Sequence, residues 1–177
     1  VWLVWSRNLS FGYWFVTSQC LAWTLGTASY YALPTLGPGF QHPWLYTTID
    51  DTNAGRLMNS LANSRVWAVN TTAESLQSIT SSLSGVAGFA SLHVAITLLV
   101  ALMIQYTTTM RWLKIVFWVN ASITAVATIY FGWHYVADDI AGVAIALVSF
   151  YVGGWASGQS FTRHRAVRER REEVTTV

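Results

Sequence analysis

Residues 128–142 read T-I-Y-F-G-W-H-Y-V-A-D-D-I-A-G and place one histidine and two acidic residues between two apolar runs. Ionisable groups next to membrane-length apolar segments are costly, and they usually mark a functional site. His134 and Asp138 are one helical turn apart, so on a helix they would share one face. A carboxylate beside an imidazole commonly orients the reactive ring nitrogen. The stretch therefore predicts a functional histidine that is supported by an acid.

A second histidine motif lies upstream, where residues 88–93 read G-F-A-S-L-H and open another apolar run. Ser91 and His93 stand at the start of this run. These two histidines, each close to the start of a membrane-length apolar segment, are the main functional signal in the chain.

The composition indicates a membrane protein rather than a soluble domain. Of the 177 residues, 53% are hydrophobic and only 10% are charged. This share of charged residues is well below that of soluble proteins. Ten tryptophans and eight tyrosines fit aromatic belts at the two membrane interfaces. Cys20 is the only cysteine, which excludes an internal disulfide and a cysteine metal cluster.

The apolar runs predict an all-α, polytopic bundle of membrane helices. A helix needs about 20 residues to cross a bilayer. Four spans are expected, at Phe11–Leu33, Val86–Tyr106, Trp112–Phe131 and Ile140–Trp155. Residues 1–158 would form one membrane domain, and residues 159–177 a basic tail.

The polar loop after the first span, residues 41–84, predicts two short helices that lie on the membrane surface. An ordinary solvated loop with amphipathic turns explains the same pattern equally well. Pro34, Gly37 and Pro38 stand before the loop and predict a sharp, rigid exit from the first span.

The positive charges indicate which end of the bundle faces the cytoplasm. Arg7, Arg111, Lys114 and the arginine-rich tail fall on one side of the predicted membrane. The positive-inside rule places that side in the cytoplasm of a plasma-membrane protein. Both histidine motifs then lie at the extracytoplasmic face.

The residue types suit chemistry at phosphorus. Asp138 would hold one ring nitrogen of His134, leaving the other to attack as a nucleophile. His93 would protonate the leaving alkoxide and later deprotonate the acceptor. Donors for the phosphoryl oxygens are the start of the second span and the side chains Ser91, Arg56 and Arg65.

Other interpretations of the same residues stay open. His134 and Asp138 could ligate a metal together with His93, although a third strong ligand is not obvious. Asp139 is better explained as a partner of the helix dipole than as a catalytic group. His42 is explained most simply as a structural or interfacial residue. A non-enzymatic scaffold or lipid-binding subunit is a further alternative to an enzyme.

These motifs resemble the type-2 phosphatidic acid phosphatase superfamily. Ser91 and His93 match its second signature, with Ala90 where proline is usual. The third signature is matched by Gly132, His134, Tyr135, Asp138 and Gly142. The resemblance implies that His134 is the nucleophile that becomes phosphohistidine, Asp138 its orienting acid, and His93 the general acid and base. It also implies six membrane helices, two of them ahead of Phe11, so we expect either further N-terminal segments in the full-length protein or a four-helix variant of the family.

The departures from the signatures point to one branch of the superfamily. Ala127 and Thr128 stand where the third signature carries Ser-Arg, and the first signature, a lysine followed by Arg-Pro, is absent. Residues 29–38 read S-Y-Y-A-L-P-T-L-G-P in its place, which resembles inositol phosphorylceramide synthases and related actinobacterial membrane proteins.

The sequence thus predicts an integral membrane phosphatase that acts on a lipid phosphate without a metal or other cofactor. The alternative is a phosphotransferase that moves a phosphoryl or inositol-phosphate headgroup to a lipid or polyol hydroxyl. Membrane lipids are the expected surroundings, and no nucleic-acid partner is expected.

Overall fold

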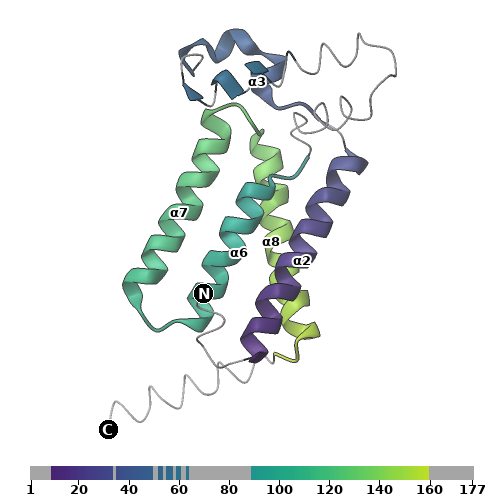
Figure 1. The fold of residues 1–177 in the computed structure, drawn as a ribbon, viewed down its shortest axis with the longest axis vertical. Coiled ribbons are helices and arrows are strands. Elements are labelled where there is room, and N and C mark those ends of the chain that lie inside the picture. The colour runs from purple at the N-terminus through teal and green to yellow at the C-terminus, as the bar shows by residue number, and fades with distance from the viewer. Residues whose placement is uncertain are drawn as a thin grey trace.

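The computed structural model describes residues 9–33, 35–49, 52–53, 55–57, 59–60, 63 and 89–159. The regular elements among these residues are all helical, so the all-α prediction is confirmed for this part of the chain. They are α2 (Leu9–Ala32), α3 (Pro38–Gln41), η1 (Pro43–Leu45), η2 (Thr47–Ile49), α6 (Leu92–Thr107), α7 (Arg111–Tyr130) and α8 (Val136–Ala156). The long helices α2, α6, α7 and α8 run side by side in alternating directions, and α3 lies beyond one end of them (Figure 1).

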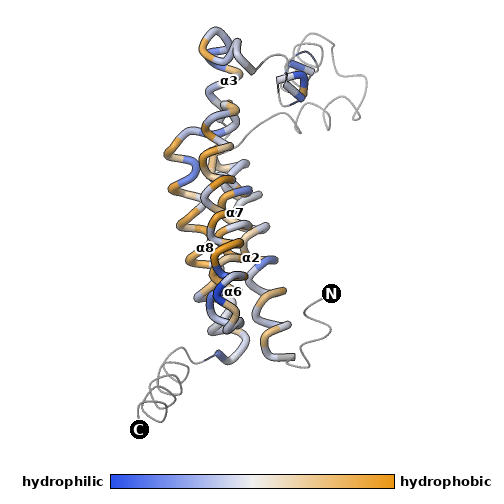
Figure 2. Tube along the Cα trace, turned by 90° about the vertical axis from the view of Figure 1, so that its left-hand side faces the viewer, coloured by the Kyte–Doolittle hydropathy of each residue, from blue (hydrophilic) through white to orange (hydrophobic). Residues whose placement is uncertain are grey.

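Among the described residues, two helices have the length and apolar character needed to cross a membrane. These are α7, with 20 residues, and α8, with 21 residues. The helix α6 is also apolar but has 16 residues. Hydrophobic residues run along the length of the bundle, as Figure 2 shows. The length and composition of α7 and α8 indicate association with a membrane.

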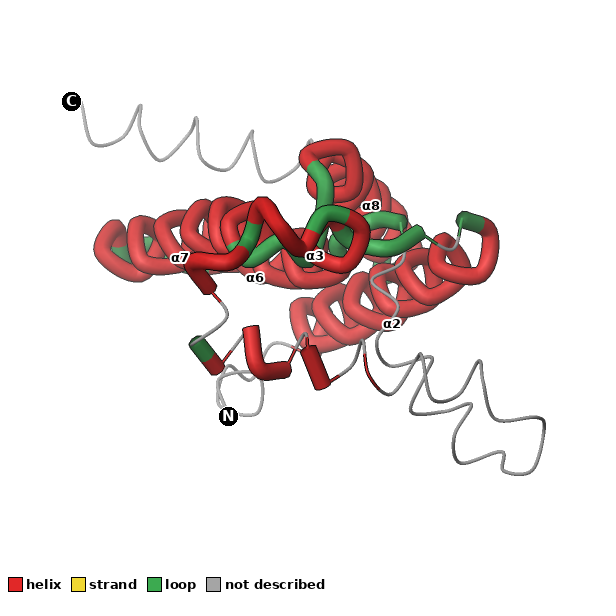
Figure 3. Tube along the Cα trace, turned by 90° about the horizontal axis from the view of Figure 1, so that it is seen from above, coloured by secondary structure: helices red, strands yellow, loops and turns green. Residues whose placement is uncertain are grey.

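The helix α6 is the centre of the bundle. It packs against α2, α7 and α8, and α2 also packs against α8 (Figure 3). The buried cluster between α2, α6 and α8 consists of Trp14, Ala22, Leu99, Met103, Ala146 and Phe150. Within it the indole Nε1 of Trp14 donates a 2.9 Å hydrogen bond to the carbonyl oxygen of Phe150. Because its polar N–H is satisfied, the large indole can be fully buried there.

Two helix boundaries differ from the prediction. The segment before Leu92 is not helical at residues 89–91, because Ala90 has a left-handed backbone (φ 70°) and Ser91 is the N-cap of α6. The last helix begins at Val136 rather than Ile140. His134 therefore precedes α8, and the prediction that it shares a helical face with Asp138 is wrong.

The predicted loop helices are described only in part. Residues 53, 55–57, 59–60 and 63 are helical, which agrees with the first of the two predicted helices. The second predicted helix, the basic tail from residue 160 onward, and the predicted site residues Pro34 and Arg65 lie outside the described residues.

Candidate active site

The turn between α7 and α8 carries His134. The carbonyl oxygen of Thr128 accepts hydrogen bonds from the backbone N–H groups of Trp133 (3.0 Å) and His134 (3.2 Å). Gly132 has a φ of +70°, a conformation that is rarely open to residues with a Cβ. The backbone of the turn is thus fixed by its own hydrogen bonds and by a glycine. It places His134 just before the start of α8.

The short helix α3 packs on this turn. The N–H of Gly39 donates a 2.9 Å hydrogen bond to the carbonyl oxygen of Gly132. A Cβ at Gly37 would overlap the carbonyl oxygen of Trp133, so only glycine permits this approach. Pro38 opens α3 and is buried. The predicted structural residues Gly37 and Pro38 therefore lie against the turn that holds His134.

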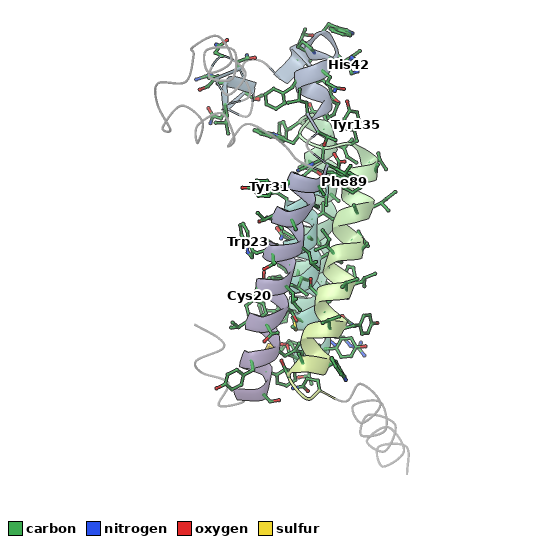
Figure 4. All side chains as sticks on the ribbon, turned by 90° about the vertical axis from the view of Figure 1, so that its right-hand side faces the viewer. Cys20, Trp23, Tyr31, His42, Phe89 and Tyr135 are labelled. Carbon is green, nitrogen blue, oxygen red and sulfur yellow. The ribbon has the colours of Figure 1, made fainter. Side chains whose placement is uncertain are left out.

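Tyr135 connects the same turn to α3 through its side chain. Its hydroxyl donates a 2.8 Å hydrogen bond to Oε1 of Gln41, the last residue of α3. His42 follows Gln41 and lies beside Trp44, with ring centroids 5.1 Å apart. Figure 4 shows His42 and Tyr135 at the same end of the bundle. The predicted structural or interfacial role of His42 stays a prediction.

His134 and Asp138 face each other inside the protein. The His134 side chain is 3% exposed and Asp138 is 4% exposed. Nδ1 of His134 lies 3.6 Å from Oδ2 of Asp138, which is an electrostatic contact rather than a formed hydrogen bond. Nδ1 has no hydrogen-bond partner among the described residues. The same Asp138 oxygen accepts a 2.9 Å hydrogen bond from the backbone N–H of Tyr135, which fixes the carboxylate at the N-terminus of α8.

Burial controls the protonation of His134. Desolvation lowers the pKa of its imidazole below the usual 6.5, because a charged ring is poorly solvated inside the protein. The Asp138 carboxylate acts in the opposite direction and raises this pKa, whereas His93 lowers it. The net shift is downward, so the neutral ring is favoured near neutral pH. A neutral imidazole keeps one nitrogen lone pair available for attack.

The start of α6 brings His93 to His134. The two imidazole centroids are 6.2 Å apart with a 58° angle between the rings, so the predicted convergence of the histidines is confirmed. His93 is exposed, in contrast to His134. Ser91 caps α6 by accepting a 3.5 Å hydrogen bond from the N–H of Val94, and its own N–H donates to the carbonyl oxygen of Asp138 at 2.8 Å. Ser91 therefore holds the start of α6 against α8. Its predicted contact with phosphate stays a prediction.

Gly142 allows α6 and α8 to approach at this point. A Cβ at Gly142 would overlap the carbonyl oxygen of Ser91. We predict that Gly142→Ala moves the start of α6 away from α8 and lowers stability by about 1–3 kcal/mol, as overpacking does. The turnover rate should fall by a larger factor than the folded fraction of the protein does. The reason is that the shift of α6 would move His93 away from His134. Thermal unfolding in detergent and a turnover assay check this.

Gly12→Ala is the matched control for that substitution. Gly12 lies in α2, and a Cβ there meets nothing within 4 Å. Alanine favours a helix over glycine by about 1 kcal/mol, so this variant should be at least as stable as the parent. Equal losses in the two variants would contradict the role given to the Gly142 approach.

Thr128 and Asp139 form a contact that the sequence patterns did not reveal. The Thr128 hydroxyl lies 3.1 Å from Oδ2 and 3.3 Å from Oδ1 of Asp139, and both residues are buried. The contact ties the last turn of α7 to the first turn of α8 on either side of His134. Asp139 is thus in the first turn of α8, where the predicted interaction with the helix dipole is also favourable. The signals in the sequence were Thr128, which stands where the third signature carries arginine, and the second acid next to Asp138.

Arg56 and Arg65 are the predicted phosphate-binding arginines, and Arg65 lies outside the described residues. Arg56 lies in the described part of the loop, where its side chain is exposed. Contact between phosphate and Arg56 or Arg65 stays a prediction.

The geometry joins three groups with different properties. His134 is buried and favours its neutral form, Asp138 lies 3.6 Å from its Nδ1, and the ring of exposed His93 lies 6.2 Å away between centroids. Such a set can attack an electrophilic centre, orient the nucleophile and exchange protons with a leaving group or acceptor.

The comparisons with known proteins gave one result. The family model described as the PAP2 superfamily matches residues 1–152 of this chain. The matched range includes both histidine motifs. Comparisons with curated proteins and with solved structures gave no match.

Proposed function

The chain belongs to the PAP2 superfamily, and from this premise we propose that it is an integral membrane phosphatase that acts on a lipid phosphate through a phosphohistidine on His134. Membership of this superfamily indicates phosphatase or phosphotransferase activity. The observation that carries the proposal is that a buried His134 has both the Asp138 carboxylate, 3.6 Å from its Nδ1, and the exposed His93 ring, 6.2 Å away between centroids, beside it.

The first half of the reaction uses all three groups. Asp138 holds the proton on Nδ1 of His134, and the lone pair of Nε2 attacks phosphorus. The bond between phosphorus and the lipid oxygen breaks, and His93 donates a proton to that oxygen. The apo distance of 3.6 Å between Nδ1 and Oδ2 would shorten as positive charge develops on the His134 ring.

The second half releases the phosphate. His93, now neutral, takes a proton from water as the water oxygen attacks phosphorus, and the bond between phosphorus and Nε2 breaks. Inorganic phosphate leaves, and both histidines return to their starting state. No metal takes part in either half, so activity should persist after exhaustive chelation.

The membrane arrangement is part of the proposal. The four long helices α2, α6, α7 and α8 would cross the bilayer, with the two histidines at the extracytoplasmic end. The helices alternate in direction, and Arg111 and Lys114 lie at the other end of the bundle, which the positive-inside rule assigns to the cytoplasm. The membrane domain would cover residues 1–158, and the basic tail 159–177 would be cytoplasmic.

A phosphotransferase is the second candidate. Residues 29–38 resemble the branch with inositol phosphorylceramide synthases, and Thr128 replaces the arginine of the third signature. In a transferase a lipid or polyol hydroxyl takes the place of water in the second half, with the same histidines.

Product analysis with a labelled lipid phosphate separates these functions. A phosphatase releases inorganic phosphate whether or not an alcohol is present. Release of phosphate only as an ester of an added alcohol would identify an obligate transferase. Absence of either product, with retained binding of the lipid, would favour the scaffold or lipid-binding alternative.

Asp138→Asn is predicted to change both the rate and its pH dependence. His134 must be neutral to attack, so kcat/KM should fall as the pH drops through its pKa, which burial places below 6.5. The carboxylate raises this pKa, so its removal should move the acid limb of the profile to still lower pH. Loss of ring orientation should also reduce the maximal rate by at least about 100-fold. A kcat/KM profile of both proteins checks this, and an unmoved acid limb would contradict it.

A further inference from the structure

Thr128 makes two contacts that enclose the segment from His134 to Asp139. Its carbonyl oxygen accepts the N–H of His134 at 3.2 Å. Its hydroxyl lies 3.1 Å from Oδ2 and 3.3 Å from Oδ1 of Asp139, and both side chains are buried. Thr128 belongs to the last turn of α7 and Asp139 to the first turn of α8, two helices that follow each other at one end of the bundle (Figure 1). A single residue therefore holds the backbone of the histidine and the start of the next helix together.

The hydroxyl proton of Thr128 has two acceptors. The carbonyl oxygen of Ala125, 2.8 Å away, lies in the same helix, and a bond of this kind is open to any helical threonine. The Asp139 side chain lies on the other helix, and a carboxylate is a stronger acceptor than a peptide carbonyl group. Of the two bonds, only the one to Asp139 links α7 to α8, so it fixes how the two helices meet.

The position of the His134 ring depends on this link, because Asp138 comes from the same turn of α8 as Asp139. Nδ1 of His134 lies 3.6 Å from Oδ2 of Asp138, whereas the backbone of His134 is bonded to the end of α7. A shift between the two helices would change the distance from the ring to the carboxylate directly. The two neighbouring acids therefore have different roles: Asp138 faces the ring, and Asp139 bonds to the residue that holds the histidine backbone.

We infer that Thr128 and Asp139 are positioning residues, whose hydrogen bond holds the His134 ring against the neighbouring carboxylate so that Nε2 can attack phosphorus. The inference rests on the proposed function for the reaction, but the orientation of the ring can be measured without turnover. It gives Asp139 a role beyond its interaction with the helix dipole.

Thr128→Val tests the inference, because it replaces the hydroxyl group by a methyl group and keeps the backbone carbonyl that bonds to His134. The kcat for a lipid phosphate should fall about tenfold or more, since misplaced reacting groups slow the chemical step. The KM should stay near the parental value, because no contact with the substrate is removed. Thr128→Ser keeps the hydroxyl group and should retain most of the parental kcat.

Thr124→Val is the matched control. Thr124 lies one turn earlier in α7, and its hydroxyl donates a 2.9 Å hydrogen bond to the carbonyl oxygen of Asn120 in the same helix. The control loses a local bond of the same kind but no bond between helices, so neither kcat nor KM should change.

Substitutions of Asp139 test the same bond from its other end. Asp139→Asn keeps an oxygen that can accept the Thr128 proton, so it should retain much more of the parental kcat than Asp139→Ala. Combining Thr128→Val with Asp139→Ala should lower kcat little further than either change alone, because both remove one and the same bond. If Thr128→Val does not fold, the comparison of the two Asp139 variants decides. Equal losses of kcat in these two variants would overturn the inference.

The orientation of the ring separates this inference from the proposed function. It is measured by NMR of the ring nitrogens in protein with isotope-labelled histidine, and the His134 signals are identified by their loss in His134→Ala. The ring proton should lie on Nδ1 in the parent and in Thr124→Val, whereas Thr128→Val should show a mixture of the two tautomers. The parental tautomer and the parental kcat in folded Thr128→Val would overturn the inference, even if the parent is an active phosphatase. A mixture of tautomers in the variant of an inactive parent would support the positioning contact and reject the proposed function.

Discussion

Replacing His134 by alanine is expected to lower the hydrolysis of a lipid phosphate by at least about 10⁴-fold, as removal of a catalytic nucleophile does. The reason is that the buried imidazole supplies the nitrogen that bonds to phosphorus, and neither Asp138 nor His93 can replace it. The change is measured as release of inorganic phosphate by protein reconstituted in vesicles. Thermal unfolding is measured on both proteins, because removal of this buried side chain leaves a cavity and lowers stability.

His42→Ala is the matched control for that prediction. His42 lies between α3 and η1 with its ring beside Trp44, and no catalytic role is proposed for it. The control should keep nearly full activity. Substantial turnover by His134→Ala would contradict the nucleophile assignment, and loss of lipid binding together with turnover in both variants would indicate a damaged fold instead.

His93→Ala should separate the two halves of the reaction. With a lipid phosphate, turnover should fall by about 10²–10⁴-fold, the usual contribution of a general acid or base. With p-nitrophenyl phosphate, the leaving group needs no proton, so the first half should be much less affected. The second half still lacks its base, and one equivalent of p-nitrophenol should appear in a burst before slow turnover.

Thr97→Ala is the control for the substitution of His93. Its hydroxyl donates a 2.8 Å hydrogen bond to the carbonyl oxygen of His93, one turn earlier in α6. Loss of that bond leaves the His93 ring in place, so no burst is expected. Equal losses of His93→Ala on both substrates, with no burst, would rule out a role for His93 in protonating the leaving group.

Much of the fold was predictable because the membrane-length apolar runs are long and separated by polar turns. The start of α8 was not predicted, since the span was drawn from the first continuous apolar residue, Ile140, whereas the helix begins at Val136. Acids are favourable in a first helical turn, where they interact with the helix dipole and free N–H groups. The helix therefore includes both acids before Ile140, and the backbone N–H of Tyr135 bonds to the Asp138 carboxylate. The serine before the apolar run at Leu92 was an unused N-cap signal.

The histidine pair was predictable from the alternation of the helices, which returns both motifs to one end of the bundle. The contacts that complete the site were not predictable, because they join residues distant in sequence without any shared periodicity. Examples are the Ser29 hydroxyl with the carbonyl oxygen of Phe89, and the Tyr135 hydroxyl with Gln41. Side-chain contacts of this kind depend on how α2, α3 and α8 meet in space.

Detection of the covalent intermediate tests the central proposal most directly. His93→Ala protein is mixed with radiolabelled p-nitrophenyl phosphate, quenched in alkali, digested and analysed by mass spectrometry. The proposed mechanism predicts a phosphoryl group on His134 that is stable in alkali, labile in acid, and absent from the His93→Ala, His134→Ala double variant. A phosphoryl group on another residue, or hydrolysis by the parent protein with no labelled peptide in any variant, would contradict it.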